Sequence, residues 1–337
     1  MWFEKSGNNS DIVISSRVRL ARNLKGYKFP GILGENEAQK IIDTVSKTDV
    51  LKEFDFKDIS KTDSLSKTKL IEQHIISREL AQSKIPCGVF TGIEDRASIM
   101  VCEEDHLRIQ SIVSGYDLEQ AYEIADKIES ELEKQLDYAF NEKYGYLTKC
   151  PTNAGTGMRA SVMMHLPALA ITNNIDTMTA AVNKLGVTVR GMYGEGSKAK
   201  AHIYQISNQF TLGVSEDETI TKLKNVVDML IEKERKISNT LFENNAPVFK
   251  DKILRAYGLM SSAYIMSSDE FMNLLPYLRL GVNSGIIRNI KNEMLSSLLV
   301  QLQPAHVMSA FGENDAEKRD IHRAEILRKA LKCAEIN

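Results

Sequence analysis

SSRVRLARN, residues 15–23, directly follows the apolar run DIVI, and the two together predict a β-strand. In a strand, residues i and i+2 point to the same face, so Arg17 and Arg19 would extend side by side. Two like charges on one face repel each other unless an anion lies between them. The stretch therefore predicts a sheet with an anion site on one of its faces.

Around this strand the pattern predicts an α+β fold. Five further strands are expected at 96–102, 107–113, 160–166, 187–193 and 202–208, and antiparallel pairing is expected because several are close neighbours. Helices are expected at 35–47, 77–84 and 117–140, where apolar residues recur every three or four positions. From about Ser215 most of the chain has helical spacing, and SNTLFENNAP (238–247) is the expected junction. We expect a domain of antiparallel sheet flanked by helices over 1–237 and an all-helical C-terminal domain over 238–337.

Composition limits the class of protein. The net charge of −2 argues against a general nucleic-acid binder, which would be clearly basic. The N-terminal residues contain no apolar signal-peptide core, and no stretch approaches the length of a membrane span. Four widely separated cysteines without a C-x-x-C pair indicate neither a zinc site nor a disulfide framework. We therefore expect a cytoplasmic protein with reduced thiols, without nucleic-acid or membrane partners.

Three further segments place arginine beside glutamate, glycine or a turn: EEDHLRIQ (103–110), CPTNAGTGMRAS (150–161) and RGMYGEG (190–196). Taken singly, each has an ordinary explanation as a solvated edge strand, an acidic turn or a glycine loop. Together with Arg17 and Arg19 they would supply five arginines, whose planar forks grip phosphate oxygens bidentately. The P-loop pattern G-x-x-x-x-G-K-[ST] and the G-x-G-x-x-G and H-R-D motifs of protein kinases are all missing. A polyphosphate held by arginines is the ligand that this set predicts.

These motifs, in this order and with RDIHRA (319–324) near the end, resemble those of the ATP:guanido phosphotransferases (phosphagen kinases). Within that superfamily the chain is most similar to the bacterial protein-arginine kinases of the McsB type. The resemblance covers nearly the whole chain, and CPTNxGTxxRAS is its most specific motif. It implies a guanido-kinase catalytic domain that uses ATP, with Mg²⁺ held mainly by the nucleotide phosphates and water and no metal site of protein ligands.

The resemblance also assigns residues. It implies that Glu104 and Glu195 hold the substrate guanidinium, with Cys150 beside it, and that His74 lies beside the nucleotide base. The nucleotide-binding residues implied are Ser15, Ser16, Arg17, Val18, Arg19, His74, Arg108, Arg159, Ala160, Ser161, Val162, Met163, Arg190, Gly191, Met192, Tyr193, Gly194 and Glu195. Cys102 departs from the family pattern, because asparagine usually precedes the two glutamates.

The expected chemistry explains the carboxylates. A guanidinium is a poor nucleophile while protonated, since its pKa is above about 12. Two carboxylates can accept its N–H groups, orient the attacking nitrogen, and remove a proton as the new bond forms. A thiol that precedes proline near cationic groups, as Cys150 does, has conditions that favour the thiolate.

The substrate is expected to be a protein. Only fourteen residues precede Ser15, whereas phosphagen kinases for small guanidines carry a long helical region there that closes over the substrate. The alternatives are a kinase for free arginine or another small guanidine, and an inactive adaptor that binds phosphoarginine.

Partners and regulation are further expectations. The surplus of apolar residues in the helices from Asp251 onward must be covered either by the catalytic domain of the same chain or by a second copy, and the resemblance implies a homodimer. The resemblance implies an activator protein, a Clp-type protease that degrades marked proteins, and a role in the stress response. It also implies an allosteric phosphoarginine site at Arg319, Asp320, Arg323 and Ala324, where the arginines would take the phosphoryl group and the aspartate the guanidinium.

Overall fold

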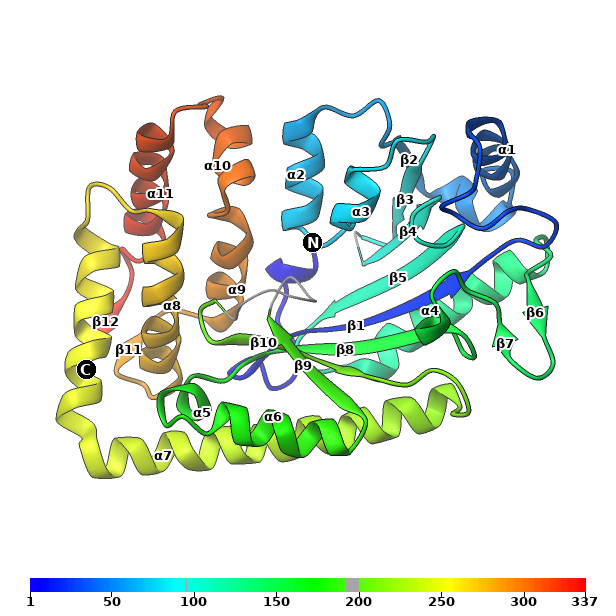
Figure 1. Cartoon of the computed structure of the whole chain (residues 1–337). Helices are drawn as coiled ribbons and strands as arrows, with labels where there is room; N and C mark the ends of the chain where they lie inside the picture. Colours follow the sequence, from blue (N-terminus) through cyan, green and yellow to red (C-terminus); the bar gives the residue numbers. More distant parts are fainter. Residues whose placement is uncertain (95, 192–199) are drawn as a thin grey trace.

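A central antiparallel sheet organises the N-terminal part of the chain (Figure 1). The structure is a computed structural model that describes residues 1–94, 96–191 and 200–337. Within them, eight strands form one sheet in the order β2-β3-β4-β5-β1-β8-β10-β9. Their bounds are β1 Val13–Arg22, β2 Asp55–Asp58, β3 Gly88–Gly92, β4 Ala97–Val101, β5 Leu107–Ser114, β8 Met158–His165, β9 Val187–Gly191 and β10 Ile203–Asn208. Two small pairs lie outside it: β6 (Phe140–Asn141) with β7 (Gly145–Tyr146), and β11 (Ile287–Arg288) with β12 (Glu335–Ile336).

The helices cover one face of this sheet and build the C-terminal domain. They are α1 Glu35–Val45, α2 Ser64–Glu72, α3 Arg78–Ala81, α4 Leu118–Glu133, α5 Pro167–Ile171, α6 Ile175–Lys184, α7 Glu216–Ser262, α8 Ser268–Asn283, α9 Asn292–Gln301, α10 Pro304–Phe311 and α11 Ala316–Ala330, with short 3₁₀ turns η1 Trp2–Glu4, η2 Asp49–Glu53 and η3 Pro151–Asn153. Apolar side chains of α4 and the first half of α7 pack with Val18 and Leu20 of β1 in the main core. The opposite face of the sheet is thereby left to the arginines. The predicted α+β class, with a helical C-terminal region, is confirmed.

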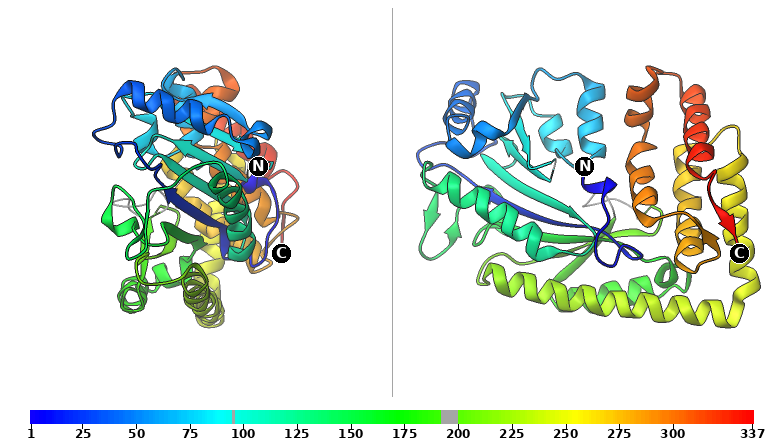
Figure 2. Two further views of the ribbon diagram at one scale, coloured as in Figure 1. Left: turned by 90° about the vertical axis from the view of Figure 1, so that its right-hand side faces the viewer. Right: turned by 180° about the vertical axis from the view of Figure 1, so that it is seen from behind.

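Helix α7 connects the two parts of the molecule. It begins with a capping box, in which the Ser215 hydroxyl accepts from the Glu218 amide and the Glu218 carboxylate accepts from the Ser215 amide. Figures 1 and 2 show that it runs beneath the sheet and then turns sharply toward the helical domain. Pro247 lies inside the helix, and proline bends a helix because it lacks an amide N–H and crowds the preceding turn. The expected junction at 238–247 is therefore helical.

The N-terminal residues join the helical domain. Trp2 and Phe3 of η1 are buried in a second core with residues of α8, α9 and α11. Met163 and Ile112 on the sheet belong to the same cluster. The second core therefore holds the helical domain against the arginine-bearing face of the sheet.

Several elements differ from the sequence predictions. The helix expected over 117–140 ends at Glu133, and that expected over 77–84 is only the single turn Arg78–Ala81. Strands β2 and β3 and helix α2 were not predicted. Among the described helices, none combines the length and the apolar character needed to cross a membrane.

Candidate active site

Strand register brings four of the predicted arginines onto one face. Arg19 of β1 lies opposite Gln110 of β5 on one side and Arg159 of β8 on the other. Arg17 is two residues away on β1, and Arg108 is two residues from Gln110 on β5, so all four share this face. Three neighbouring strands thus place these arginines together on the face where SSRVRLARN predicts an anion site.

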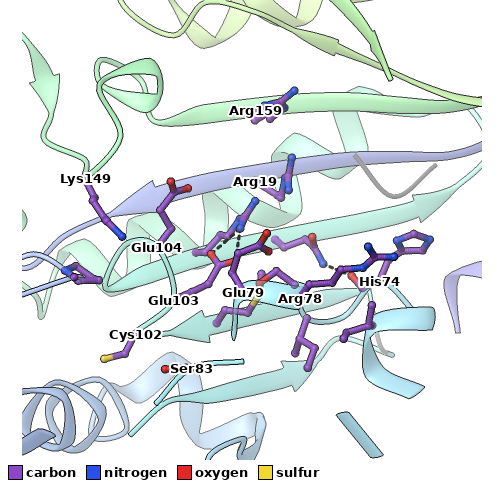
Figure 3. A pocket seen from close by; sticks show the side chains of 18 of the residues that line it. Arg19, His74, Arg78, Glu79, Ser83, Cys102, Glu103, Glu104, Lys149 and Arg159 are labelled. Carbon is purple, nitrogen blue, oxygen red and sulfur yellow. Dashed lines mark hydrogen bonds and ion pairs between the residues drawn. The ribbon is translucent and has the colours of Figure 1, made fainter. Parts of the chain in front are cut away.

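The arginines line a cavity of about 650 Å³ (Figure 3). Arg190 of β9, opposite Gln205 of β10, also reaches it. Among the described lining residues, the cationic side chains outnumber the carboxylates, which are Glu79, Glu103 and Glu104. The cationic side chains are Arg17, Arg19, Arg78, Arg108, Lys149, Arg159 and Arg190. This excess of positive charge suits a ligand with several negative charges.

Burial and the repulsion between neighbouring guanidinium groups lower the pKa of two arginines of this face. Burial, together with the charges of Arg108 and Arg159, lowers the pKa of Arg17 to about 9. Burial and the same neighbours, with Arg17, lower the pKa of Arg19 well below its ordinary value. Arg19 Nε is buried and has no hydrogen-bond partner in the described part of the chain. A phosphate group between these side chains would supply both the missing acceptor and the opposing charge.

Other groups fix the directions of these arginines. Both carboxylate oxygens of buried Glu103 accept from Arg108 Nη1, the longer contact being 2.6 Å. Burial opposes the charge of Arg108, but Glu103 more than offsets this and raises its pKa. The hydroxyl of Ser207 accepts from Arg159 Nη2 at 2.9 Å, and that of Ser161 accepts from the guanidinium of its cross-strand neighbour on β1 at 3.5 Å. The cluster is therefore pre-organised.

His74 lies at one end of the cavity, in the connection between α2 and α3. Its φ of 59° is in the left-handed region, and Gln110 Nε2 donates to its carbonyl oxygen at 2.8 Å. Burial, with the charges of Arg17 and Arg19, lowers its pKa to about 3, so the imidazole is neutral at physiological pH. The Trp2 ring lies 5.9 Å from the His74 ring.

Glu104 occupies the other end of the cavity, near Lys149 (Figure 3). It belongs to the loop between β4 and β5, which a buried neighbour, Asp105, ties to the cysteine loop. Asp105 Oδ1 accepts from Asn23 Nδ2 at 2.6 Å and from the amide of Lys149 at 2.7 Å. Cys150 is the next residue, half-buried, with its sulfur 2.9 Å from the Thr152 hydroxyl. Asp105 therefore holds the loop that carries Glu104 against the loop that carries Cys150.

Burial and the adjacent charge of Asp105 raise the pKa of Glu104. A carboxylate with a raised pKa is a better proton acceptor than an ordinary glutamate.

The loop between β4 and β5 begins at Cys102, where the family usually has asparagine, and the φ of Cys102 is 62°. Asparagine tolerates this left-handed conformation better than cysteine does. The turn nevertheless forms with cysteine, and the Cys102 amide donates to the His106 carbonyl at 2.9 Å.

The remaining predicted residues divide by strand face. The side chains of Val18, Ala160 and Val162 pack in the main core, on the face away from the arginines. Ser15, Ser16, Ser161 and Met163 are buried, and Gly191 ends β9. Met192, Tyr193, Gly194 and the second candidate carboxylate, Glu195, lie outside the described residues.

Sequence reasoning missed lining residues that the fold brings in from elsewhere. Arg78 follows the helix cap Ser77, whose hydroxyl accepts from the Leu80 amide at 3.0 Å. Lys149 directly precedes the predicted cysteine, outside its quoted motif, and Gln110 ends EEDHLRIQ, but neither was given a role. Their only sequence signal was that proximity.

The predicted phosphoarginine site lies on α11, far from this cavity in sequence. Arg323 is buried, and its guanidinium donates to the carbonyls of Leu302 at 2.8 Å and Met266 at 2.9 Å and to the Asp320 carboxylate. Arg319 is less buried and contacts the sulfur of Met308 on α10. Ala324 is buried beside them. Arg319 and Asp320 are therefore the more accessible members of this set.

Within the described part of the chain, no three or more His, Cys, Asp or Glu side chains are arranged to hold a metal ion. Glu103, the most buried carboxylate of the cavity, is committed to an arginine. These residues fit a Mg²⁺ ion that takes its ligands mainly from phosphate oxygens and water.

Comparison with protein families gives two adjoining matches. Residues 35–237 match the ATP:guanido phosphotransferase C-terminal catalytic domain, and residues 246–337 match the protein-arginine kinase McsB C-terminal domain.

Similar proteins include the protein-arginine kinases of Geobacillus sp. (strain WCH70), 41% identical over 99% of this chain and 94% of that protein, and of Clostridium tetani, 39% identical over 98% of each. Among solved structures, lombricine kinase is 25% identical with a TM-score of 0.61, over 71% of each chain. A duplicated taurocyamine kinase from Schistosoma mansoni with bound transition-state-analog components is 26% identical with a TM-score of 0.58, over 69% of this chain and 34% of that one.

Proposed function

The chain belongs to the ATP:guanido phosphotransferases and, within them, to the protein-arginine kinases, and on this basis we propose which of its residues bind ATP and which bind the substrate guanidinium. It transfers a phosphoryl group from ATP to the guanidinium of arginine side chains in proteins. The proposal concerns which groups hold each part of the two substrates. The observation that carries it is the face of four register-matched arginines between Glu104 and His74.

We assign the phosphate chain of ATP to the arginines of this face. Arg17, Arg19, Arg108 and Arg159 lie on adjacent strands, and Arg190 reaches the cavity from β9. The nucleotide base is assigned to the end marked by His74. The phosphoryl group in flight is loose and highly charged, so positioning and charge neutralisation supply most of the catalysis. Mg²⁺, when bound to the phosphates, adds to that neutralisation.

The substrate guanidinium is assigned to the end marked by Glu104. The carboxylate accepts N–H groups of the guanidinium and takes a proton as the new P–N bond forms, with Glu195 as its proposed partner. Cys150 is proposed to orient the guanidinium from the neighbouring loop. The tie through Asp105 supports this grouping, since it fixes the two loops relative to each other.

The protein substrate distinguishes this assignment from a kinase for free arginine. The test is incubation with ATP and either free arginine or a loosely folded protein, followed by mass spectrometry under conditions that preserve the acid-labile P–N bond. Phosphoarginine in the protein is the expected result. Phosphate on free arginine alone would contradict it, and phosphorylation of neither substrate would favour the inactive adaptor.

We also propose the wider setting that the resemblance implies. The site would act in the cytoplasm, with an activator protein, and its mark would be recognised by a Clp-type protease. A homodimer through the helical domain is supported by apolar side chains near the end of α7, where Leu259 is 47% exposed and Tyr264 69%. Phosphoarginine binding at Arg319 and Asp320 would regulate the enzyme.

A further inference from the structure

The interface between the catalytic and helical domains includes the residues just before His74, which we call the His74 segment (Glu72 to His74). Glu72, the last residue of α2, is 6% exposed, and its carboxylate is held by α10 of the other domain. Its Oε1 accepts from the Ala305 amide at 2.9 Å. Its Oε2 accepts from the His306 amide at 3.1 Å and lies 2.7 Å from His306 Nδ1. Figures 1 and 2 show the two helices side by side.

This contact replaces a cap that α10 does not supply for itself. The residue before α10, Gln303, makes no side-chain cap hydrogen bond, and the first amides of a helix need an external acceptor. Glu72 fills that need from another domain. Both of its oxygens are thereby used, and the end of α2 is fixed to α10.

The two residues after Glu72 are held as tightly. Trp2 Nε1 donates to the Gln73 carbonyl at 3.0 Å, and Gln110 Nε2 donates to the His74 carbonyl at 2.8 Å. Three consecutive residues are therefore fixed by three separate elements: α10, η1 and β5. Of these, α10 is part of the helical domain and η1 packs into its core.

We propose that Glu72 is a positioning residue through which the helical domain fixes His74, so that ATP affinity depends on the contact between α2 and α10. This rests on the proposed placement of the nucleotide base beside His74. The contact also gives the helical domain a route to the nucleotide site, since α10 is touched by Arg319 of α11 through Met308.

The test compares two isosteric substitutions. Glu72→Gln turns one acceptor of the α10 cap into a donor. The matched control is Glu234→Gln, because Glu234 of α7 is also buried and accepts from the amides of Ala168 at 2.7 Å and Leu169 at 3.0 Å within the catalytic domain. ATP affinity is measured by titration on the full-length protein, alongside kcat and KM for ATP. Trp2 is the single tryptophan of the chain, so its emission reports on the His74 segment directly.

We expect Glu72→Gln to weaken ATP binding about fivefold, or ~1 kcal/mol, with kcat at saturating ATP within about twofold of wild type and a changed Trp2 emission. Glu234→Gln should leave ATP affinity and emission unchanged. A loss of stability alone would not separate KM from kcat in this way.

Two further variants keep the inference falsifiable if Glu72→Gln does not fold. His306→Ala removes only the side-chain contact and should weaken ATP binding in the same direction but less. His74→Ala tests the placement of the nucleotide base separately from the coupling through Glu72. If it weakens ATP binding while the Glu72 and His306 variants bind normally, the coupling is wrong and the nucleotide site stands. If it binds ATP normally, the base placement fails and the coupling fails with it.

Discussion

Replacing Glu104 with glutamine should remove most of the catalysis and leave ATP binding intact. The amide has nearly the same shape as the carboxylate but cannot take a proton from the guanidinium. A positioned acid–base group contributes roughly 10²–10⁴-fold, so we expect a loss of about 3–5 kcal/mol in transition-state stabilisation. ATP affinity should change little, because Glu104 lies at the opposite end of the cavity from His74.

The pH dependence gives a second measure. Ionised Glu104 is the form that accepts N–H groups, and burial with the charge of Asp105 raises its pKa above the ordinary 4.5. Turnover should therefore fall, as the pH is lowered, at a higher pH than for an exposed glutamate. The other charges near Glu104 are Glu103, which also raises its pKa, and Arg108 and Lys149, which lower it. Asp105→Asn keeps an acceptor oxygen but removes a negative charge, so the acid limb should move to lower pH.

The assay is phosphoarginine formation on a loosely folded protein, measured as ADP release and checked by mass spectrometry that preserves the P–N bond. Glu79→Gln is the matched control, since it removes one carboxylate charge from the same cavity. Turnover of Glu104→Gln within about threefold of the Glu79→Gln control would refute the reasoning, since even the lower limit for such a group is about a hundredfold.

Four other outcomes are expected. Arg159→Ala and Arg190→Ala should weaken ATP binding by about 2–5 kcal/mol and lower the rate, and calorimetry with unchanged affinity in both would contradict the phosphate assignment. Arg319→Ala or Asp320→Ala should abolish stimulation by added phosphoarginine while ATP binding persists. A wild-type response would show that these residues of α11 do not form a regulatory site. Light scattering at micromolar concentration should give the mass of a dimer, and a monomer would count against the predicted interface. Glu129→Ala should lower the free energy of unfolding by about 3–5 kcal/mol, because it leaves its buried arginine partner on β1 unpaired.

The sequence predicted the face of the sheet better than its edges. Alternation fixed which residues of β1 share a face, and the register then brought the arginines of three strands together. Strand β2 (Asp55–Asp58) was missed because its residues are mostly exposed and polar, so it shows no alternation. Strand β3 (Gly88–Gly92) begins and ends with glycine, which weakens a strand pattern.

Long-range contacts were beyond the sequence altogether. The asparagine-rich stretch before Pro247 favoured a junction, yet helix α7 runs through it. The role of His74 came from resemblance, and only the fold shows that Trp2 and Gln110 hold its segment. Such contacts join residues far apart in the chain, and no local pattern encodes them.

The placement of the N-terminal turn governs the order in which the molecule can be completed during synthesis. Trp2 and Phe3 leave the ribosome long before their packing partners on α9 (Asn292–Gln301), which lie far further along the chain. At ~5–20 residues per second, translation of the intervening chain takes roughly 15–60 s, during which these two aromatic side chains have no finished core to enter. A nascent chain with a finished sheet thus still lacks the contacts from α10 that hold the segment before His74, and the nucleotide site proposed there is completed only when these helices emerge.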